Sequence, residues 1–290
     1  MPRLQVLMPA RNSAETVGKA VQSTIRALPE DSEILLWDDA SSDSTVERAE
    51  AAASRAGGRL RVFSISEAVG TGAALNRLLQ IADCSFIARM DSDDVCLPWR
   101  FRAQLPHVET GTLVFSSAAM FPIGHLRYKL PKTPRLQSNT IKLMLLIGNR
   151  LVHPTLTCRL EDMTALGGYS TMPKGQDYEL WLRAITRQFN FISLAMPSIA
   201  YRITQTQSTR QPGYGAAVFE DPRLYKSYYS ALRQVLPGFV SDSNSAPGID
   251  ELRRELESKA RCLSGMQSAV LTRALHDERA FALLRWRANT

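Results

Sequence analysis

The sequence predicts an α/β fold: a mixed, mostly parallel sheet flanked by helices, followed by a helical C-terminal extension. Short apolar runs alternate with segments of helical periodicity through the first 90 residues. Two of these runs end in clustered aspartates, as expected where the carboxyl ends of strands carry a binding site. The chain of 290 residues is long enough to bury a core without disulfides, so its four cysteines, which lack metal-binding spacing, are expected to be reduced thiols.

The first part of the chain predicts the element order βαβαβαβ. Strands are expected at residues 4–8, 33–37, 59–64 and 86–89, each a short apolar run. The first helix carries apolar residues at helical spacing from Val17 to Leu28. The last of these helices opens at Gly70-Thr71-Gly72 and ends near Ile81. Such alternation implies parallel strands joined by right-handed crossovers, with helices on both faces of the sheet.

Three carboxylates, Asp91, Asp93 and Asp94, directly follow the strand at 86–89. Like charges this close repel and raise one another's pKa unless a cation lies among them, which indicates a site for Mg²⁺ or Mn²⁺. The alternative is an acidic turn that caps the next helix. The second strand also ends in an acidic pair, of which Asp38 is expected to cap the helix that follows.

The charge and hydropathy of the chain exclude some partners. The net charge of +7 suits attraction to anionic lipid or to phosphate-bearing substrates, or is simply a basic surface. Nucleic acid is not an expected partner, because the sequence has no basic helix with interleaved aromatics. It has no leader-like start and no apolar run long enough to cross a bilayer, so a cytoplasmic protein is expected. The longest apolar run, residues 141–148, predicts a buried helix.

Several ordered motifs resemble those of a known enzyme family. The upstream motifs are Pro9-Ala10-Arg11-Asn12, Asp38-Asp39-Ala40-Ser41-Ser42-Asp43, Gly72-Ala73-Ala74-Leu75-Asn76 and Asp91-Ser92-Asp93-Asp94. The downstream motifs are His153-Pro154-Thr155, Gly167-Gly168-Tyr169, Gly175-Gln176-Asp177-Tyr178 and Tyr201-Arg202. In order and spacing they resemble an inverting family 2 glycosyltransferase of Rossmann-like GT-A fold, of the type that builds bacterial surface polysaccharides. The resemblance implies a catalytic domain at 1–215, made of a nucleotide-sugar half at 1–105 and an acceptor half at 106–215, and a helical extension at 216–290.

The resemblance also implies which residues bind the metal. Asp93 would ligate Mn²⁺ or Mg²⁺ directly, and Asp91 would approach the ribose of the nucleotide-sugar or the water shell of the metal. His153 would be either a further metal contact or a structural hydrogen bonder.

The nucleotide itself would be held at the ends of the first two strands. Pro9 and Arg11 would line the base, with the Arg11 guanidinium stacking on it. Asp39 would accept a hydrogen bond from an imide nitrogen, which favours a uridine or thymidine donor and therefore a UDP-sugar.

Asp177 would be the general base that takes the proton from the acceptor hydroxyl, with inversion at the anomeric carbon. Glu179 is the rival base, two residues later and on a different face of the same helix. Trp181 is expected in the core and not as a sugar platform. The acceptor would be a saccharide or a lipid-linked saccharide.

Two other functions stay open. A sugar-1-phosphate nucleotidyltransferase can use the same architecture, but it carries a glycine-rich loop with Arg and Lys after the first strand, unlike Pro9-Ala10-Arg11-Asn12. A non-catalytic nucleotide-sugar-binding module would be favoured by loss of the metal carboxylates or of the base, and both are present.

The C-terminal part has two polar breaks, at 205–215 and 241–248, and a helix is expected to start near Ile249. The last helices combine apolar residues with arginines. This pattern predicts packing on the catalytic core or on a second subunit, or peripheral docking on anionic lipid at the inner membrane face. The residues concerned are Leu271, Ala274, Leu275, Phe281, Leu284 and Trp286, with Arg273, Arg279, Arg285 and Arg287.

Overall fold

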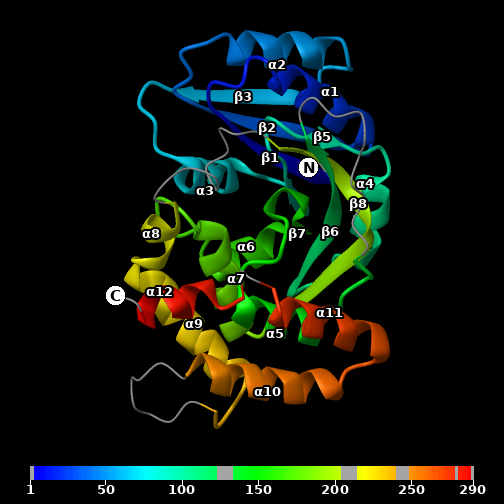
Figure 1. Cartoon of the computed structure of the whole chain (residues 1–290). Helices are drawn as coiled ribbons and strands as arrows, with labels where there is room; N and C mark the ends of the chain where they lie inside the picture. Colours follow the sequence, from blue (N-terminus) through cyan, green and yellow to red (C-terminus); the bar gives the residue numbers. More distant parts are fainter. Residues whose placement is uncertain (1–2, 123–132, 204–213, 240–247, 278–279, 289–290) are drawn as a thin grey trace.

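The computed structural model describes residues 3–122, 133–203, 214–239, 248–277 and 280–288. Within these residues the strands form one mixed sheet in the order β3-β2-β1-β4-β7-β6-β8-β5 (Figure 1). The pairs β1–β2, β1–β4, β2–β3 and β6–β8 are parallel, and β4–β7, β6–β7 and β5–β8 are antiparallel. The predicted mixed, mostly parallel sheet with flanking helices is therefore confirmed.

The N-terminal half follows the predicted order. Its strands are β1 (Leu4–Ala10), β2 (Ser32–Asp39), β3 (Leu60–Ile65) and β4 (Phe86–Arg89). Its helices are α1 (Val17–Ala27), α2 (Thr45–Ser54) and α3 (Thr71–Ile81). Alternation along β1 sends Leu4 and Val6 to the face covered by α1 and α2, and Leu7 to the face covered by α3. The sheet therefore separates two apolar cores.

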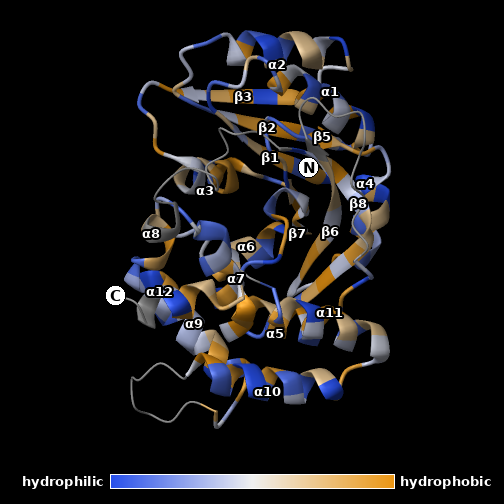
Figure 2. Cartoon of the chain, viewed as in Figure 1, coloured by the Kyte–Doolittle hydropathy of each residue, from blue (hydrophilic) through white to orange (hydrophobic). Residues whose placement is uncertain are grey.

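The second half completes the sheet and surrounds its lower part with helices. Its strands are β5 (Val95–Cys96), β6 (Thr112–Pro122), β7 (Thr157–Arg159) and β8 (Asn190–Ile203). Its helices are α4 (Arg100–Gln104), α5 (Ser138–Ile147), α6 (Leu160–Leu166) and α7 (Gln176–Thr186), with 3₁₀ turns η1 (Leu105–His107) and η2 (His153–Thr155). Helix α5 is apolar and buried, as the sequence predicts. In Figure 2 the ribbon of α5 is largely coloured as hydrophobic.

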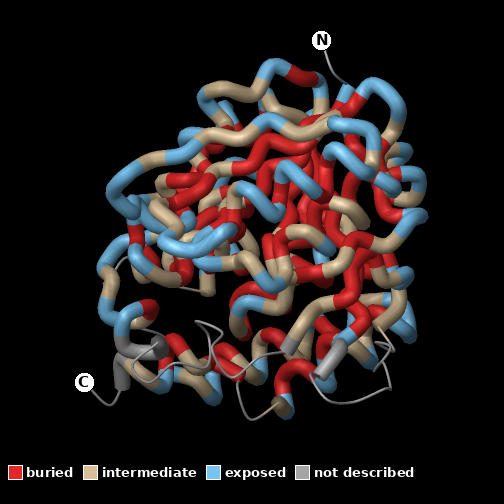
Figure 3. The backbone as a smooth tube through the Cα atoms, turned by 90° about the horizontal axis from the view of Figure 1, so that it is seen from above, coloured by how far each residue is buried: buried red, intermediate tan, exposed pale blue. Residues whose placement is uncertain are grey.

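The C-terminal helices share a core with α5 and α7. They are α8 (Tyr214–Phe219), α9 (Pro222–Val235), α10 (Ile249–Arg261), α11 (Gly265–Leu275) and α12 (Ala282–Ala288). Their apolar residues belong to the same continuous cluster as α5 and α7, and buried segments run through the centre of the molecule (Figure 3). The Phe281 N–H also donates to the Ile147 carbonyl at the end of α5, at 2.8 Å. Residues 214–288, where described, are thus built onto α5 and α7.

This packing decides between the alternatives that the sequence left open. The residues considered for lipid contact are not on the surface: Leu271 and Leu275 are 0 % exposed, Phe281 is 1 % and Leu284 is 4 % exposed. Their apolar side chains complete the core, which confirms the packing alternative and is incompatible with docking on lipid through these side chains. Arg279, the side chain of Arg287 and most of the two polar breaks lie outside the described residues. No helix of the described part is long and apolar enough to span a bilayer.

Candidate active site

The end of β4 presents the three carboxylates at the middle of the sheet. Arg100, which is fully buried, donates from Nη2 to the Arg89 carbonyl at 2.7 Å and so supports the strand where it ends. The carboxylate oxygens of Asp91, Asp93 and Asp94 then lie within 4.8 Å of one another. Clustering of the three acids, expected from their spacing, is present in the structure.

Strand β8 fixes this cluster from the other side. The Arg202 N–H donates to Asp94 Oδ1 at 2.9 Å, and Arg202 Nε donates to the Asp93 carbonyl at 2.9 Å. Asp94 is 1 % exposed, and its Oδ2 has no hydrogen-bond partner among the described residues. A buried carboxylate oxygen without a donor costs free energy unless a cation or a proton satisfies it. The donor set, all carboxylate oxygen, fits Mg²⁺ or Mn²⁺.

The charges of the cluster interact strongly. Burial, with the nearby Asp91 carboxylate, raises the pKa of Asp93 to about 6. Burial, with the Asp91 and Asp93 carboxylates, raises the pKa of Asp94 well above its usual range. Burial is the largest cause of both shifts, and repulsion between the acids adds to it. A bound divalent ion would reverse the repulsion.

We expect Asp93→Asn to make the metal-free protein more stable at pH 7. The folded-state pKa of Asp93, about 6, lies above the ordinary value of 3.8, so the folded state holds the proton more tightly and stability falls as pH rises through this window. The amide removes that loss. Melting temperatures in a chelator should differ between wild type and variant at pH 7 and converge near pH 4. A variant that is equally destabilised at both pH values would contradict the shift.

A strand-end pocket of about 770 Å³ lies beside the cluster. It gathers all the residues expected to bind the nucleotide-sugar, together with the expected metal ligand: Pro9, Arg11, Asp39, Asp91 and Asp93. Asn12, in the left-handed region with φ of 48°, ties the first two strand ends together. Its N–H donates to Ser41 Oγ at 2.9 Å, and its Oδ1 accepts from the Ser42 N–H at 2.9 Å.

Both acids at the end of β2 accept hydrogen bonds from backbone N–H groups. Asp39 accepts the N–H groups of Val69 and Gly70, at 2.8 and 2.9 Å, and so fixes the loop that opens α3. Each oxygen of Asp39 already accepts one N–H group, and its recognition of the base stays a prediction. The prediction that Asp38 caps α2 is wrong: Asp38 accepts from the Ser41 N–H within the turn, at 3.3 Å.

Asp43 takes the place at the start of α2 that the sequence assigned to Asp38. Its Oδ1 accepts the Thr45 N–H at 3.0 Å and also the Thr45 hydroxyl. Several residues separate Asp38 from the start of α2, so Asp38 does not reach the helix and the nearer acid, Asp43, accepts its first N–H group.

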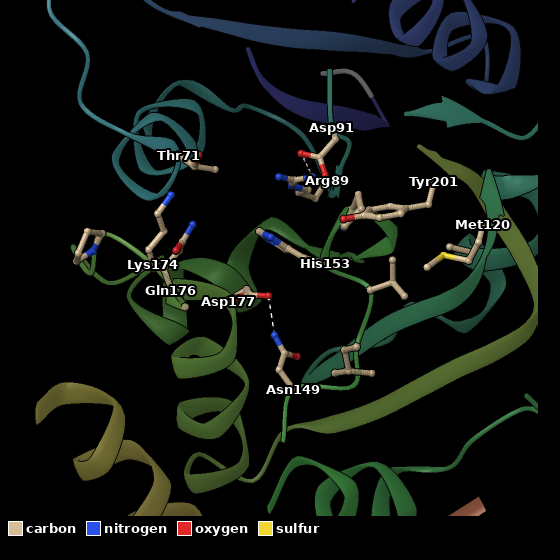
Figure 4. A pocket seen from close by; sticks show the side chains of 16 residues that line it. Thr71, Arg89, Asp91, Met120, Asn149, His153, Lys174, Gln176, Asp177 and Tyr201 are labelled. Atoms are coloured by element: carbon tan, nitrogen blue, oxygen red, sulfur yellow. Dashed lines mark hydrogen bonds and ion pairs between the residues drawn. The ribbon is translucent and has the colours of Figure 1, made fainter. Parts of the chain in front are cut away.

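A central pocket of about 480 Å³ adjoins the strand-end pocket and shares Thr71, Asp91, Pro173, Lys174 and Tyr201 with it. Figure 4 shows Asp91 with Arg89 on one side of the central pocket and Asp177 with Asn149 on the other, with His153 between them. Asp91 and the predicted base therefore face a common space, whereas Asp93 lines only the strand-end pocket.

Helix α7 carries Asp177 in its first turn. Gly175, with φ of 73°, starts the helix, and a Cβ there would lie 2.8 Å from Val218, so the close approach of α8 requires glycine. Asp177 Oδ2 accepts from Asn149 Nδ2 at 2.8 Å. Burial raises the pKa of Asp177, and the Asn149 hydrogen bond opposes that rise. A carboxylate with a raised pKa is a stronger base than one in water.

The rival base has a structural role. Glu179 is 5 % exposed and accepts from Arg183 Nε and Nη2 at 3.0 and 2.8 Å, and from Ser227 Oγ at 2.8 Å. It does not line the central pocket. Trp181 is fully buried against Phe115, with ring centroids 4.9 Å apart, which confirms its expected place in the core.

His153 lines the central pocket, and its Nε2 is hydrogen-bonded to the Tyr169 hydroxyl at 2.9 Å. Burial, with the charge of Arg89, lowers the pKa of His153 well below its usual range, so the imidazole is neutral. Within the described residues the acidic cluster that could hold a metal does not include it. Its metal contact stays a prediction.

Sequence reasoning assigned no role to three residues of the site. Arg89 is buried in the central pocket and forms an ion pair with Asp91. Its position two residues before Asp91 was the available signal, since alternate residues of an extended chain share a face. Lys174 lines both pockets, directly before the motif that carries Asp177. Asn149 lies in a loop 28 residues before its partner, and no local pattern marks it.

Comparisons with known proteins agree with this architecture. The profile described as "Glycosyl transferase family 2" matches residues 5–166, more than half of the chain. The amylovoran biosynthesis glycosyltransferase AmsE of Erwinia amylovora is 32% identical over 129 residues, which cover 44% of this chain and 48% of that protein. The chain thus spans about half the length of that relative.

Two solved structures share the fold. S. aureus TarS 1-349 in complex with UDP-GlcNAc superposes with a TM-score of 0.58 and 13% identity, covering 99% of this chain and 92% of that one. The mannosyltransferase PcManGT from Pyrobaculum calidifontis, in complex with GDP-Man and Mn²⁺, gives a TM-score of 0.60 and 13% identity, covering 99% and 83%. With the matched profile, the sheet order and the positions of the motifs, the chain belongs to glycosyl transferase family 2 and has the GT-A fold.

Proposed function

We propose that this protein is a metal-dependent, inverting glycosyltransferase that moves a sugar from a UDP-sugar to a saccharide or lipid-linked saccharide acceptor in bacterial surface polysaccharide or glycolipid synthesis. One observation carries the proposal. Asp91 of the carboxylate cluster after β4 and the half-buried carboxylate of Asp177 line the same central pocket, and Asp91 and Lys174 also line the adjoining strand-end pocket, where Asp93 lies.

The chemistry follows from this arrangement. Mn²⁺ or Mg²⁺ held by Asp93, with Asp91 and Asp94 around it, would neutralise charge on the departing diphosphate. Lys174, at the junction of the two pockets, adds a positive charge near the same group. Asp177 lies across the pocket from the carboxylates, where it takes the proton of the attacking hydroxyl. Attack from the side opposite the leaving group inverts the anomeric carbon.

Recognition of the nucleotide is assigned to the strand-end pocket. Arg11 and Pro9 line it, and the Asp39 carboxylate has acceptor capacity left for an imide N–H. TarS, crystallised with UDP-GlcNAc, supports a uridine donor, whereas PcManGT was crystallised with GDP-Man and Mn²⁺. A test must therefore compare uridine with guanosine nucleotides, each with and without Mn²⁺.

The test is the melting temperature of the protein with UDP, dTDP, GDP or CDP, each with and without Mn²⁺. A ligand that binds only the folded state raises stability by about 2.7 kcal/mol at 100 times its dissociation constant. UDP with Mn²⁺ should give the largest rise, and UDP alone a smaller one. A larger rise with GDP, or no effect of Mn²⁺, would contradict the donor or the metal assignment respectively.

We place the reaction in the cytoplasm, with peripheral contact at the inner membrane face where a lipid-linked acceptor would be presented. The net charge of +7 supports attraction to an anionic surface. Contact through the apolar residues of α11 and α12 is not part of this proposal, since they are buried.

Asn149→Ala is expected to shift the pH profile of transfer. The Asn149 hydrogen bond lowers the pKa of Asp177, so its loss raises that pKa, and the base stays protonated to higher pH. The acid limb of kcat should move to higher pH with little change in the KM for the donor.

The matched control is Asn190→Ala, at an exposed residue that begins β8. It should leave the pH profile unchanged. An unshifted profile in Asn149→Ala, with Asp177→Asn inactive, would show that Asn149 does not position the base.

A further inference from the structure

A side cavity of about 490 Å³ lies next to the central pocket. The two share a wall made of Ala118, Met120, Leu151 and Val152. The cavity lies between β6, α5 and α11, so the C-terminal extension supplies one of its walls. Its apolar lining consists of Leu136, Ile141, Met144, Leu145, Val270 and Ala274.

Two arginines also line the cavity. Arg150 Nη1 pairs with Asp277 Oδ2 at 3.2 Å, whereas Arg150 Nη2 is buried with no hydrogen-bond partner among the described residues. Arg273 is an exposed lining residue on α11. A buried guanidinium nitrogen without an acceptor favours an anionic oxygen as its partner.

The lining is poor in groups that hold a sugar ring. Among the described residues that line the cavity, none is aromatic and none has a side-chain amide, and the carboxylate of Asp277 is paired with Arg150. Four residues of the lining carry hydroxyls, and two of these hydroxyls donate within the fold, Ser116 to Ser198 and Ser117 to the Ala195 carbonyl; the others are Thr133 and Ser193. Sugars are usually recognised by aromatic faces and by several convergent hydrogen-bonding groups. Apolar walls with two guanidinium groups instead match an amphipathic anion, in which a phosphate adjoins a hydrocarbon chain.

Arg150 places the side cavity next to the residue that bonds the predicted base. Asn149, which is bonded to Asp177, and Arg150, which lines the cavity, are consecutive residues. Their Cα atoms are therefore about 3.8 Å apart. The partner of Asp177 and the arginine of the side cavity are thus neighbours in one loop, beside the wall that the two pockets share.

We propose that the side cavity binds the lipid diphosphate of the acceptor, with its phosphates at Arg150 and Arg273 and the first part of its hydrocarbon chain between α5 and α11. The inference rests on the proposed function and names its acceptor as lipid-linked. The terminal sugar of that acceptor then reaches Asp177 in the central pocket.

The test measures binding of farnesyl diphosphate to the full chain by titration calorimetry in the presence of saturating UDP and Mn²⁺. Inorganic diphosphate and farnesol serve as probes of charge and chain alone. Farnesyl diphosphate should bind at least tenfold more tightly than either, without displacing UDP. Displacement of UDP would place the probe in the donor site and overturn the inference, as would absence of binding.

Three variants locate the probe. Val270→Trp, at a half-buried position, fills the cavity and should weaken farnesyl diphosphate binding at least tenfold. Arg273→Ala, at an exposed position, should weaken it several-fold without endangering the fold. Arg261→Ala, also exposed and at the end of α10, is the matched charge control and should bind normally. Unchanged binding in both Val270→Trp and Arg273→Ala would overturn the site.

The other source of the same chemistry is the membrane itself. Flotation with phosphatidylglycerol vesicles that contain no lipid diphosphate distinguishes it. Val270→Trp should float as the wild type does, because the cavity is proposed to bind the acceptor and not a phospholipid of the membrane. Loss of flotation in Val270→Trp would assign the cavity to membrane phospholipid and contradict the proposal. UDP binding with Mn²⁺ is measured in every variant, so failure of the donor assignment is seen separately.

Discussion

Asp177→Asn is expected to lower sugar transfer by about 100-fold or more, the range typical of losing a general base. The amide keeps the size of the side chain and can still bond with Asn149, but it cannot take the acceptor proton. Affinity for UDP and Mn²⁺ should change little, because those ligands are assigned to the strand-end pocket and to the cluster after β4. The loss should therefore appear in kcat.

The comparison requires that the variant is folded. Asp250→Asn, in the exposed first turn of α10, makes the same chemical change away from the pockets and should transfer at the wild-type rate. A role for Asp177 in the stability of α7 alone would lower activity only in step with the melting temperature. A stable Asp177→Asn enzyme with near-normal transfer would refute the assignment of the base. Glu179 would be a poor replacement, since Arg183 and Ser227 already occupy it.

Asp93→Ala is expected to abolish the effect of Mn²⁺ on UDP binding. A residue that only supports a metal ligand typically contributes about 10–100-fold to metal affinity, so loss of a direct ligand should exceed that range. The fold should persist, because Asp93 is half-buried and its removal relieves repulsion within the cluster. Calorimetric titration of UDP with and without Mn²⁺ gives the measurement.

Asp91→Ala is the comparison variant. Asp91 also holds the buried Arg89 in an ion pair and lines both pockets, so its loss should weaken UDP binding both with and without metal. The difference between the two variants separates a metal ligand from a residue that touches the donor. Metal-stimulated UDP binding that survives in Asp93→Ala would transfer the ligand role to Asp94 or Asp91.

What the sequence predicted depended on local pattern. Strand β4 was recognisable because an apolar run ends abruptly in three acids, and the repulsion among those acids already indicates a cation. The partners of these groups were not recognisable. Asn149 reaches Asp177, and Arg202 reaches Asp93 and Asp94, only through the packing of segments 28 to 109 residues apart.

The C-terminal helices show a second limit. Apolar residues at helical spacing beside arginines are typical both of a helix that covers a core and of a helix that lies on a membrane. The pattern of α11 and α12 was compatible with both, and only their packing in the same core as α5 and α7 shows which one applies. Likewise Asp38 and Asp43 both suit a helix cap, and only the length of the turn selects Asp43.

The shared core of the extension has a consequence for biosynthesis. The N-terminal half can collapse around its own core as it leaves the ribosome, but α5, which also packs on β8, α7 and α9, is fully covered only when α11 has been made. At about 5–20 residues per second, the 140 residues from position 150 to position 290 take about 7–28 s to synthesise. During that interval the loop that carries Asn149 lacks two contacts that anchor it, from Phe281 to Ile147 and from Asp277 to Arg150. The nascent chain is therefore expected to expose apolar surface, and to be inactive, until these residues have been translated.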